Sequence, residues 1–188
     1  RLFVSRGKRV LLTSYTHSAV DNLLCKLVDG GVKAHPSSSQ ENTLHPIIRI
    51  GREKSCHPNT QSILAQNIAY EVERRVSKDS PPIEKPGVEY LHQVISSARV
   101  VGVSALTAPR SPLLAGQHFD VVIVDEAGQI SQPAILGAMM AADKFVLVGD
   151  HLQLPPLVKS EVAEEAGYAV HWLQAHGAPG VRAFANYL

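Results

Sequence analysis

Two adjacent carboxylates, Asp125 and Glu126, are the residues best placed for chemistry in this 188-residue sequence. They follow Val121–Val124, a run of β-branched residues that predicts a buried strand. In open α/β sheets, ligands bind at the carboxyl ends of the strands. One carboxylate there can hold Mg²⁺ beside a nucleotide, and its neighbour can orient and deprotonate the attacking water. The alternative interpretation is a strand that ends in a solvated acidic turn.

A polar loop follows a second apolar run, residues 145–148, and is expected at the same edge of the sheet. It contains Gly149, Asp150 and Gln153 and closes with Pro155-Pro156. Because an amide cannot ionise, Gln153 suits hydrogen bonding to a γ-phosphate and relaying its loss to a neighbouring loop. Taken alone, these residues are also typical of an ordinary turn.

Hydroxyl and imidazole side chains gather between a third expected strand, residues 10–15, and the helical pattern that follows it. Backbone N–H groups and the helix dipole favour phosphate at such a position. The alternative interpretation is simple helix capping, for which Ser18 and Asp21 have roughly the capping-box spacing. The candidate phosphate contacts are Thr13, Ser14, Thr16, His17, Ser18 and Asn22.

Several other chemistries are excluded by the same sequence. Gly7-Lys8 is followed by Arg9 and lacks the upstream glycine of GxxxxGK[ST], so these residues contain no phosphate-cradling P-loop. Cys25 and Cys56 form no CxxC pair and are too few for a disulfide scaffold, so a reducing compartment is expected. The histidines are scattered, and a zinc site is not predicted.

The elements that must position these residues are short apolar runs alternating with helical patterns. Continuous apolar strands are typical of a parallel sheet with helices on both faces, so the predicted fold class is α/β. Helices are predicted over residues 19–28, ending before Gly30-Gly31, and over residues 133–142, beginning at a proline. Strands are predicted at residues 10–15, 47–51, 100–103, 121–124 and 145–148.

Two segments interrupt this alternation. Residues 34–46 are polar and turn-prone, and we expect a surface loop there. Residues 52–98 contain one predicted helix, 61–76, followed by Pro-rich sequence that breaks it. That stretch has the character of an insertion between core strands and not of a second independent core.

Composition and charge are those of one ordinary globular domain. Hydrophobic residues make up 45% of the chain and charged residues 19%, which excludes disorder throughout. No apolar run approaches the length of a transmembrane helix. Residues 1–60 carry nine Lys and Arg against four Asp and Glu, which fits a phosphate-rich partner or simply a solvated surface. The chain begins at Arg1 without a methionine, so we expect its native N-terminus to lie upstream.

Together, the three polar segments resemble the superfamily 1 helicases of the nonsense-decay type, most of all the DNA replication helicase/nuclease branch. Leu11–Asn22 is similar to motif Ia, Ile123–Pro133 to motif II and Phe145–Val158 to motif III. Arg99–Ser104 occupies the place of motif Ic, with a weak match. The similarity covers roughly residues 7–30 and 98–158, and Gly128 stands where the family usually has Ser.

The resemblance implies a RecA-like P-loop NTPase fold that uses ATP and Mg²⁺. By this similarity, Asp125 would bind Mg²⁺, Glu126 would activate water and Gln153 would contact the γ-phosphate, with Gly149 and Asp150 beside them. Gln129 would couple the nucleotide to the DNA side. Thr16, His17 and Ser18 would touch the backbone of a single strand, with Thr13, Ser14 and Asn22 in the same segment.

The resemblance also implies a domain organisation: residues 1–160 form most of a first RecA-like domain, incomplete at both ends and with the insertion at about 52–98, and residues 161–188 form a divergent tail. The P-loop, the arginine-finger domain and a nuclease domain with an iron–sulfur cluster would lie outside this chain. Implied partners are single-stranded or flap DNA and replication and repair proteins, with no membrane, in the nucleus and also the mitochondrion. The alternatives are a related RNA helicase, or a truncated product that binds nucleic acid without catalysis.

Overall fold

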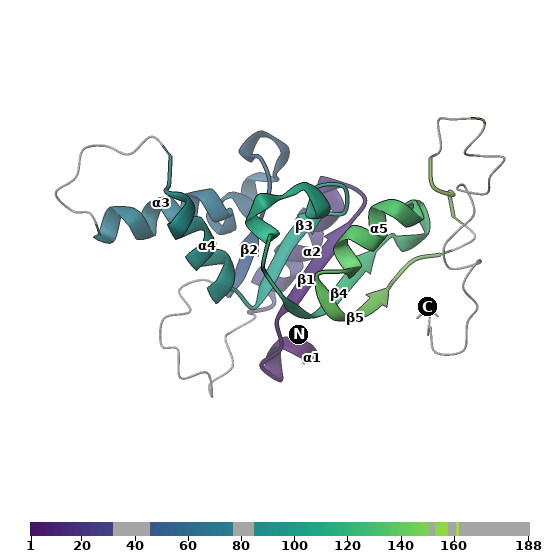
Figure 1. The fold of residues 1–188 in the computed structure, drawn as a ribbon, viewed down its shortest axis with the longest axis horizontal. Helices are drawn as coiled ribbons and strands as arrows, with labels where there is room; N and C mark the ends of the chain where they lie inside the picture. Colours follow the sequence, from purple (N-terminus) through teal and green to yellow (C-terminus); the bar gives the residue numbers. More distant parts are fainter. Residues whose placement is uncertain (32–45, 77–84, 151–152, 158–160, 162–188) are drawn as a thin grey trace.

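The computed structural model describes residues 1–31, 46–76, 85–150, 153–157 and 161 (Figure 1). Its centre is a five-stranded parallel sheet with the strand order β2-β3-β1-β4-β5. This arrangement confirms the predicted α/β class with a parallel sheet. The strands are β1 (Val10–Ser14), β2 (Ile47–Arg49), β3 (Val100–Ser104), β4 (Phe119–Asp125) and β5 (Ala142–Leu147).

The register of the sheet brings the carboxyl ends of its three central strands to one edge. Ser14, the last residue of β1, is paired with Ser104 of β3 on one side and with Asp125 of β4 on the other. Loops that leave these strands therefore begin at the same level. The polar segments that follow β1, β3 and β4 are neighbours for this reason.

Helices cover both faces of the sheet, because successive strand residues point to opposite sides. Val10 and Leu12 pack with α2 (His17–Asp29) on one face. Leu11 and Val122 pack on the other face with apolar residues of three helices. Those helices are α3 (Ala65–Val76), α4 (Val88–Ser97) and α5 (Gln132–Met139), and a single turn, α1 (Leu2–Ser5), precedes β1.

Gly102 in the middle of β3 lets α2 lie close to the sheet. A Cβ atom built at this position would lie 2.6 Å from Cδ1 of Leu24, which is fully buried in α2. A larger residue would push the helix or its leucine away from the sheet. The close packing of α2, which carries the motif Ia side chains, thus depends on the absence of a side chain at Gly102 of β3.

The segment 52–98 contains more helix than the sequence predicted. The predicted helix 61–76 is divided into a 3₁₀ stretch, η2 (Pro58–Ile63), and α3, with extended Leu64 between them. α4 was missed because Pro86 and Gly87 directly precede it, although Gly87 serves as its N-cap. Ile68 and Ile95 from these two helices lie in the same core cluster as the sheet, so both helices are part of its cover.

Boundaries differ elsewhere by a few residues. α5 ends at Met139, and β5 begins at Ala142, earlier than the predicted strand. The chain turns at residues 140–141 because Ala142 already pairs with Phe119 of β4. Most of the predicted surface loop, residues 34–45, lies outside the described residues, as does the tail after residue 161. Short 3₁₀ turns fill the connections: η1 (Glu53–Ser55), η3 (Ala108–Arg110), η4 (Pro112–Leu114) and η5 (Ala127–Gln129).

Within the described part of the chain, no helix is both long and apolar enough to span a bilayer.

Candidate functional site

The predicted carboxylate pair stands at the carboxyl end of β4, the strand beside the central strand β1. Asp125 is its last residue, and Glu126 begins the turn that follows; both are partly exposed. Glu126 has φ 54° and ψ 37°, the left-handed conformation, and is the only non-glycine residue with positive φ in the described ranges. Such a conformation costs about 1–3 kcal/mol and persists only where the surroundings impose it. It turns the chain sharply between the two carboxylates.

Backbone hydrogen bonds to the loop after β5 hold this turn in place. Val148 donates its N–H to Val124 and accepts one from Ala127, both at 2.8 Å. A Cβ atom built at Gly149 would lie 2.9 Å from the backbone nitrogen of Gly128, so a side chain at position 149 would force the two loops apart. The motif II turn and the motif III loop therefore form one backbone unit.

Gln129 fixes the side chain of Glu126. Its Nε2 donates a hydrogen bond to Oε2 of Glu126 at 3.1 Å. Asp125, in contrast, accepts no hydrogen bond from any residue that the structure describes. Asp125 is partly exposed, and carboxylate oxygens are ligands that Mg²⁺ prefers, usually one or two beside waters and phosphates. The residues present fit a nucleotide-bound magnesium ion held from this strand end.

A magnesium site of this kind differs from one in which protein side chains alone surround the ion. In the described residues no three His, Cys, Asp or Glu side chains gather closely enough to enclose an ion. Metal binding here would depend on phosphate oxygens as further ligands.

Gln153 and Asp150 lie together on the exposed loop after β5. The Gln153 amide donates to Oδ2 of Asp150 at 3.4 Å, and its backbone N–H to the Asp150 carbonyl at 3.3 Å. Among the described residues, no hydrogen bond joins Gln153 to Asp125 or Glu126. The described structure therefore places Gln153 on the loop that braces the carboxylate turn, without direct contact to the carboxylates.

The six residues predicted for nucleic acid divide into two groups. Thr13 and Ser14 are fully buried in β1, and their hydroxyls have no hydrogen-bond partner among the described residues. Their side chains do not reach the surface in this structure because they point from the strand into the packed layers. The accessible members are Thr16, His17, Ser18 and Asn22, at the start of α2.

Thr16 caps α2, and the capping box suggested for Ser18 and Asp21 is wrong. The Oγ1 of Thr16 accepts a hydrogen bond from the Ala19 N–H at 3.1 Å, and Thr16 has the extended backbone of an N-cap. Asp21 is buried instead and belongs to a different network. Ser18 remains exposed, with its hydroxyl free of the capping role.

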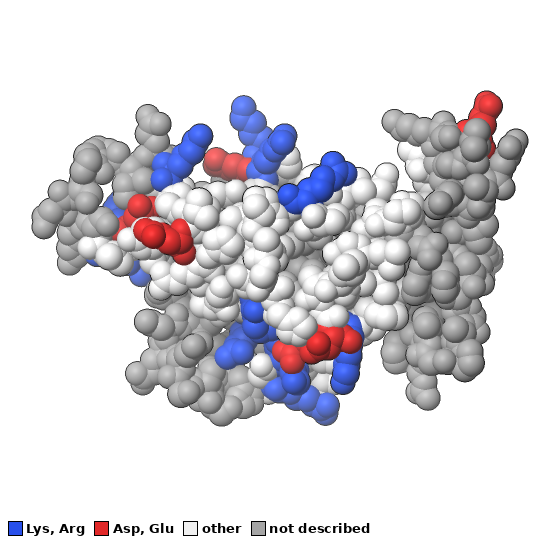
Figure 2. All heavy atoms as spheres, in the orientation of Figure 1, with Lys and Arg blue, Asp and Glu red and all other residues white. Residues whose placement is uncertain are grey.

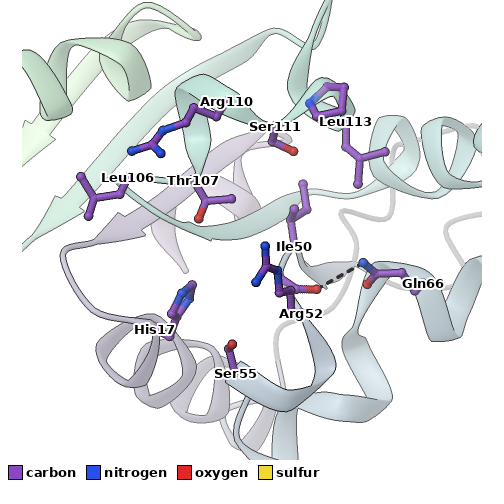
Figure 3. Close-up of a pocket in the computed structure, with 12 residues that line it drawn as sticks. His17, Ile50, Arg52, Ser55, Gln66, Leu106, Thr107, Arg110, Ser111 and Leu113 are labelled. Carbon is purple, nitrogen blue, oxygen red and sulfur yellow. Dashed lines mark hydrogen bonds between the residues drawn. The ribbon is translucent and has the colours of Figure 1, made fainter.

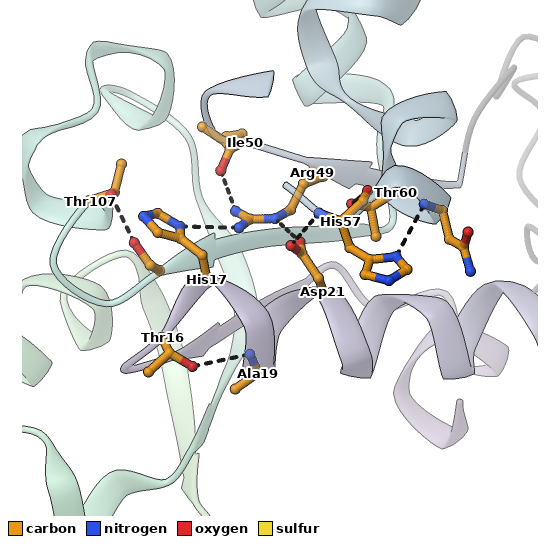
Figure 4. A network of polar contacts seen from close by, with 11 residues as sticks. Thr16, His17, Ala19, Asp21, Arg49, Ile50, His57, Thr60 and Thr107 are labelled. Carbon is orange, nitrogen blue, oxygen red and sulfur yellow. Dashed lines mark hydrogen bonds and ion pairs between the residues drawn. The ribbon is translucent and has the colours of Figure 1, made fainter. Parts of the chain in front are cut away.

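A buried ion pair ties α2 to the strand β2, as Figure 4 shows. Arg49 is fully buried, and its Nε donates to Oδ1 of Asp21 at 2.6 Å. The other Asp21 oxygen accepts the His57 N–H at 2.8 Å, which adds the segment before η2. The sequence carries a signal for this pair, because a charged residue within the apolar run Ile47–Ile50 requires a buried partner.

Arg49 also determines which nitrogen of His17 carries the proton. Nη2 of Arg49 lies 3.2 Å from Nδ1 of His17. Because a guanidinium can only donate, Nδ1 must accept, and the proton of the neutral ring is on Nε2. Burial lowers the pKa of His17, and the positive charge of Arg49 lowers it further. His17 is thus a neutral hydrogen-bond donor at the start of α2.

Residues 68–161 match a family described as an AAA domain, and the match spans half of the chain. The chain belongs to the AAA domain family. The predicted α/β fold of the RecA-like type agrees with this AAA domain, and the match includes the carboxylate turn and the loop after β5.

Relatives of this AAA domain include proteins named DNA replication ATP-dependent helicase/nuclease DNA2. The chain is 40% identical to that of Xenopus laevis over 167 residues, which are 89% of this chain and 14% of the relative. It is 39% identical to that of Saccharomyces cerevisiae over 168 residues, 89% of this chain and 9% of the relative. It is 36% identical to that of Homo sapiens over 167 residues, which are 89% of this chain and 13% of the relative. The resemblance to the helicase/nuclease branch is confirmed, and the chain spans about a seventh or less of these relatives.

Proposed function

We propose that this chain is part of the ATPase motor of a DNA replication helicase/nuclease, in which ATP hydrolysis drives movement along single-stranded DNA. The observation that carries the proposal is the carboxylate turn after β4, with Glu126 held by Gln129 and the turn bonded to the loop after β5. The identity of 36–40% to the three helicase/nuclease relatives supports the same function.

In this motor, Glu126 receives the proton of the attacking water as the water oxygen bonds to the γ-phosphorus and the bond from that phosphorus to the leaving oxygen breaks. Gln129 keeps the accepting oxygen in place through its hydrogen bond. Asp125 would hold the magnesium ion, which neutralises phosphate charge when bound. Gly149, Asp150 and Gln153 lie on the adjoining loop, where Gln153 would respond to the γ-phosphate.

On the nucleic-acid side, the accessible start of α2 would contact the backbone of the strand. Thr16, Ser18 and Asn22 are exposed there, and His17 offers Nε2–H. Hydroxyl, amide and imidazole donors suit phosphate oxygens, which position a protein on a strand without reading its sequence. We extend the proposal to flap DNA as substrate, to replication and repair proteins as partners, and to action in the nucleus and mitochondrion.

The test is phosphate release by the full-length protein that contains this chain, measured with single-stranded DNA, with RNA of the same sequence and without nucleic acid. Stimulation by DNA well above that by RNA is expected. Stimulation by RNA alone would replace the proposal with an RNA helicase. Binding without any ATP hydrolysis would replace it with a non-catalytic nucleic-acid-binding protein.

A further inference from the structure

A cavity of about 450 Å³ opens beside the start of α2, and of its lining residues the proposed function uses only His17. Figure 3 shows its walls: the first turn of α2, the loop after β2 and the loop after β3. These three segments leave parallel strands at the same edge of the sheet. The polar side chains that line the cavity are His17, Arg52, Ser55, Gln66, Thr107, Arg110 and Ser111.

The charged groups of this cavity are all positive. Arg52 comes from the loop after β2 and Arg110 from the loop after β3, and both project into the space in Figure 3. No Asp or Glu lines the cavity, and among the described residues no carboxylate lies within 4.0 Å of either guanidinium. Figure 2 shows that Lys and Arg side chains outnumber acidic ones over these loops. Although Glu53 follows Arg52 in the chain, neither guanidinium forms an ion pair among the described residues, and two such groups favour an anion, phosphate above all.

The walls that carry the two arginines are held by the fold. Gln66 donates to the carbonyl of Gly51 at 3.2 Å, and a Cβ at Gly51 would lie 3.1 Å from Sγ of Cys56. On the other wall, the hydroxyls of Ser104 and Thr107 are 2.8 Å apart, with Ser104 itself buried at the end of β3. A site with fixed walls loses little conformational entropy when a ligand binds.

His17 belongs both to this cavity and to the accessible start of α2. The buried Arg49 holds the Nδ1 side of the ring, so the remaining donor of the ring is Nε2. Because His17 lies between Thr16 and Ser18 in the chain and also lines the cavity, the cavity adjoins the proposed strand contacts of α2. Leu106, which is 43% exposed, adds apolar surface at the rim for a sugar or base.

We infer that this cavity binds the phosphodiester backbone of single-stranded nucleic acid, with Arg52 and Arg110 as its cationic contacts. The inference rests on the proposed function, because it extends the same nucleic-acid path from the start of α2. It adds two sequence-independent phosphate contacts from segments that lie outside motif Ia.

The first test measures strand affinity of the full-length protein by fluorescence anisotropy at several salt concentrations. Arg52→Gln and Arg110→Gln are each expected to weaken binding about tenfold. Each should also flatten the slope of log affinity against log salt by about 0.7, and the double variant by about 1.4. Arg75→Gln is the matched control, because Arg75 is an exposed arginine of α3 outside the cavity; it should change neither quantity.

The second test locates the contact on the strand. Methylphosphonate linkages, which carry no charge, are introduced one at a time along the oligonucleotide. In the wild type, neutralising one or two linkages should weaken binding, and at those linkages the double variant should show no further loss. If the loss of affinity from each neutral linkage adds in full to the loss from the double variant at every position, the inference is overturned.

Further variants distinguish the inference from its competitors. Arg52→Lys and Arg110→Lys keep the charge, so they should retain the salt slope; equal losses in the Lys and Gln variants would indicate a structural role and overturn it. If the double variant loses binding of inorganic tripolyphosphate but keeps its strand affinity, the cavity is assigned to a free phosphate compound.

A comparison with the start of α2 separates the cavity inference from the proposed function. If the Ser18→Ala/Asn22→Ala variant binds the strand weakly but the double arginine variant binds it normally, only the cavity inference fails. If the wild type binds no strand, the proposed function fails too.

Discussion

Glu126 combines a strained backbone with a fixed side chain, and both features follow from its neighbours. Its left-handed conformation is held by the Ala127–Val148 hydrogen bond, and its carboxylate by Gln129. Asp125, one residue earlier, has no such partner among the described residues. The Glu126 carboxylate is thus held by a hydrogen bond and the Asp125 carboxylate is not, which is consistent with the separate roles proposed for them.

This difference predicts distinct phenotypes in the full-length protein. Glu126→Gln keeps the size and hydrogen bonding of the side chain but removes the base, so turnover should fall by a factor of about 10² or more with nucleotide affinity nearly unchanged. Asp125→Asn should weaken magnesium-dependent nucleotide binding as well. Phosphate release and nucleotide affinity are measured on both variants. Equal affinities in two active variants would contradict these roles.

Gln129→Ala should lower turnover without changing ATP affinity, because Gln129 contacts the Glu126 carboxylate directly. A loss of about tenfold in kcat is expected for a positioning hydrogen bond of about 1.4 kcal/mol. If Gln129 also couples the nucleotide site to the DNA side, the stimulation of ATP hydrolysis by DNA should fall together with kcat. Comparison of kcat and KM for ATP in the presence and absence of a strand checks this. An increase in KM alone would instead place Gln129 in nucleotide binding.

The start of α2 allows capping and nucleic-acid contact to be separated. Thr16→Ala removes the cap and should cost about 1 kcal/mol of unfolding free energy. Ser18→Ala combined with Asn22→Ala leaves the cap intact, so it should weaken strand affinity with little change in melting temperature. Hydroxyl and amide donors release few counterions, so the salt slope should change by much less than about 0.7. Unchanged affinity in the double variant would rule out strand contact by Ser18 and Asn22.

At the scale of elements, the Arg49–Asp21 pair determines how α2 lies against β2. Both residues are buried, and Asp21 also accepts a hydrogen bond from the segment before η2. Asp21→Asn leaves a buried guanidinium without its carboxylate, which should destabilise the protein by about 3–5 kcal/mol. Chemical denaturation of the wild type and the variant measures this loss.

An exposed pair provides the control for this prediction. Arg75 and Glu71 on α3 are 3.8 Å apart and mostly exposed, so Glu71→Gln should cost only about 0–1 kcal/mol. Similar losses for Glu71→Gln and Asp21→Asn would show that burial does not decide the strength of the Arg49 pair.

At the scale of the whole molecule, the 188-residue chain holds the carboxylates of a phosphoryl-transfer site but no GxxxxGK[ST] sequence. We therefore predict that the purified chain alone does not hydrolyse ATP, because the phosphate cradle and a stabilising arginine are both needed, and the arginine alone is worth about 10³–10⁵ in rate. DNA-stimulated phosphate release by the chain, abolished by Asp125→Asn, would contradict this.

The sequence by itself determined the features that depend on local pattern. Continuous apolar runs specified parallel strands, and strand-ending polar residues specified which edge carries the chemistry. Asp125 and Glu126 could be placed at that edge because a strand end and its following turn are adjacent in the chain. The same local logic failed at α4, where Pro86 and Gly87 suggested an interruption but Gly87 begins a helix.

Only the tertiary structure decided which distant residues meet. Arg49 is 28 residues from Asp21 in sequence, and their pairing depends on how α2 crosses the sheet. The burial of Thr13 and Ser14 depends on the layers packed over β1. The left-handed conformation of Glu126 depends on the hydrogen bond that Ala127 donates to the loop after β5. The cavity that brings Arg52 toward Arg110 exists because parallel strands end at one edge, so loops far apart in sequence become neighbours in space.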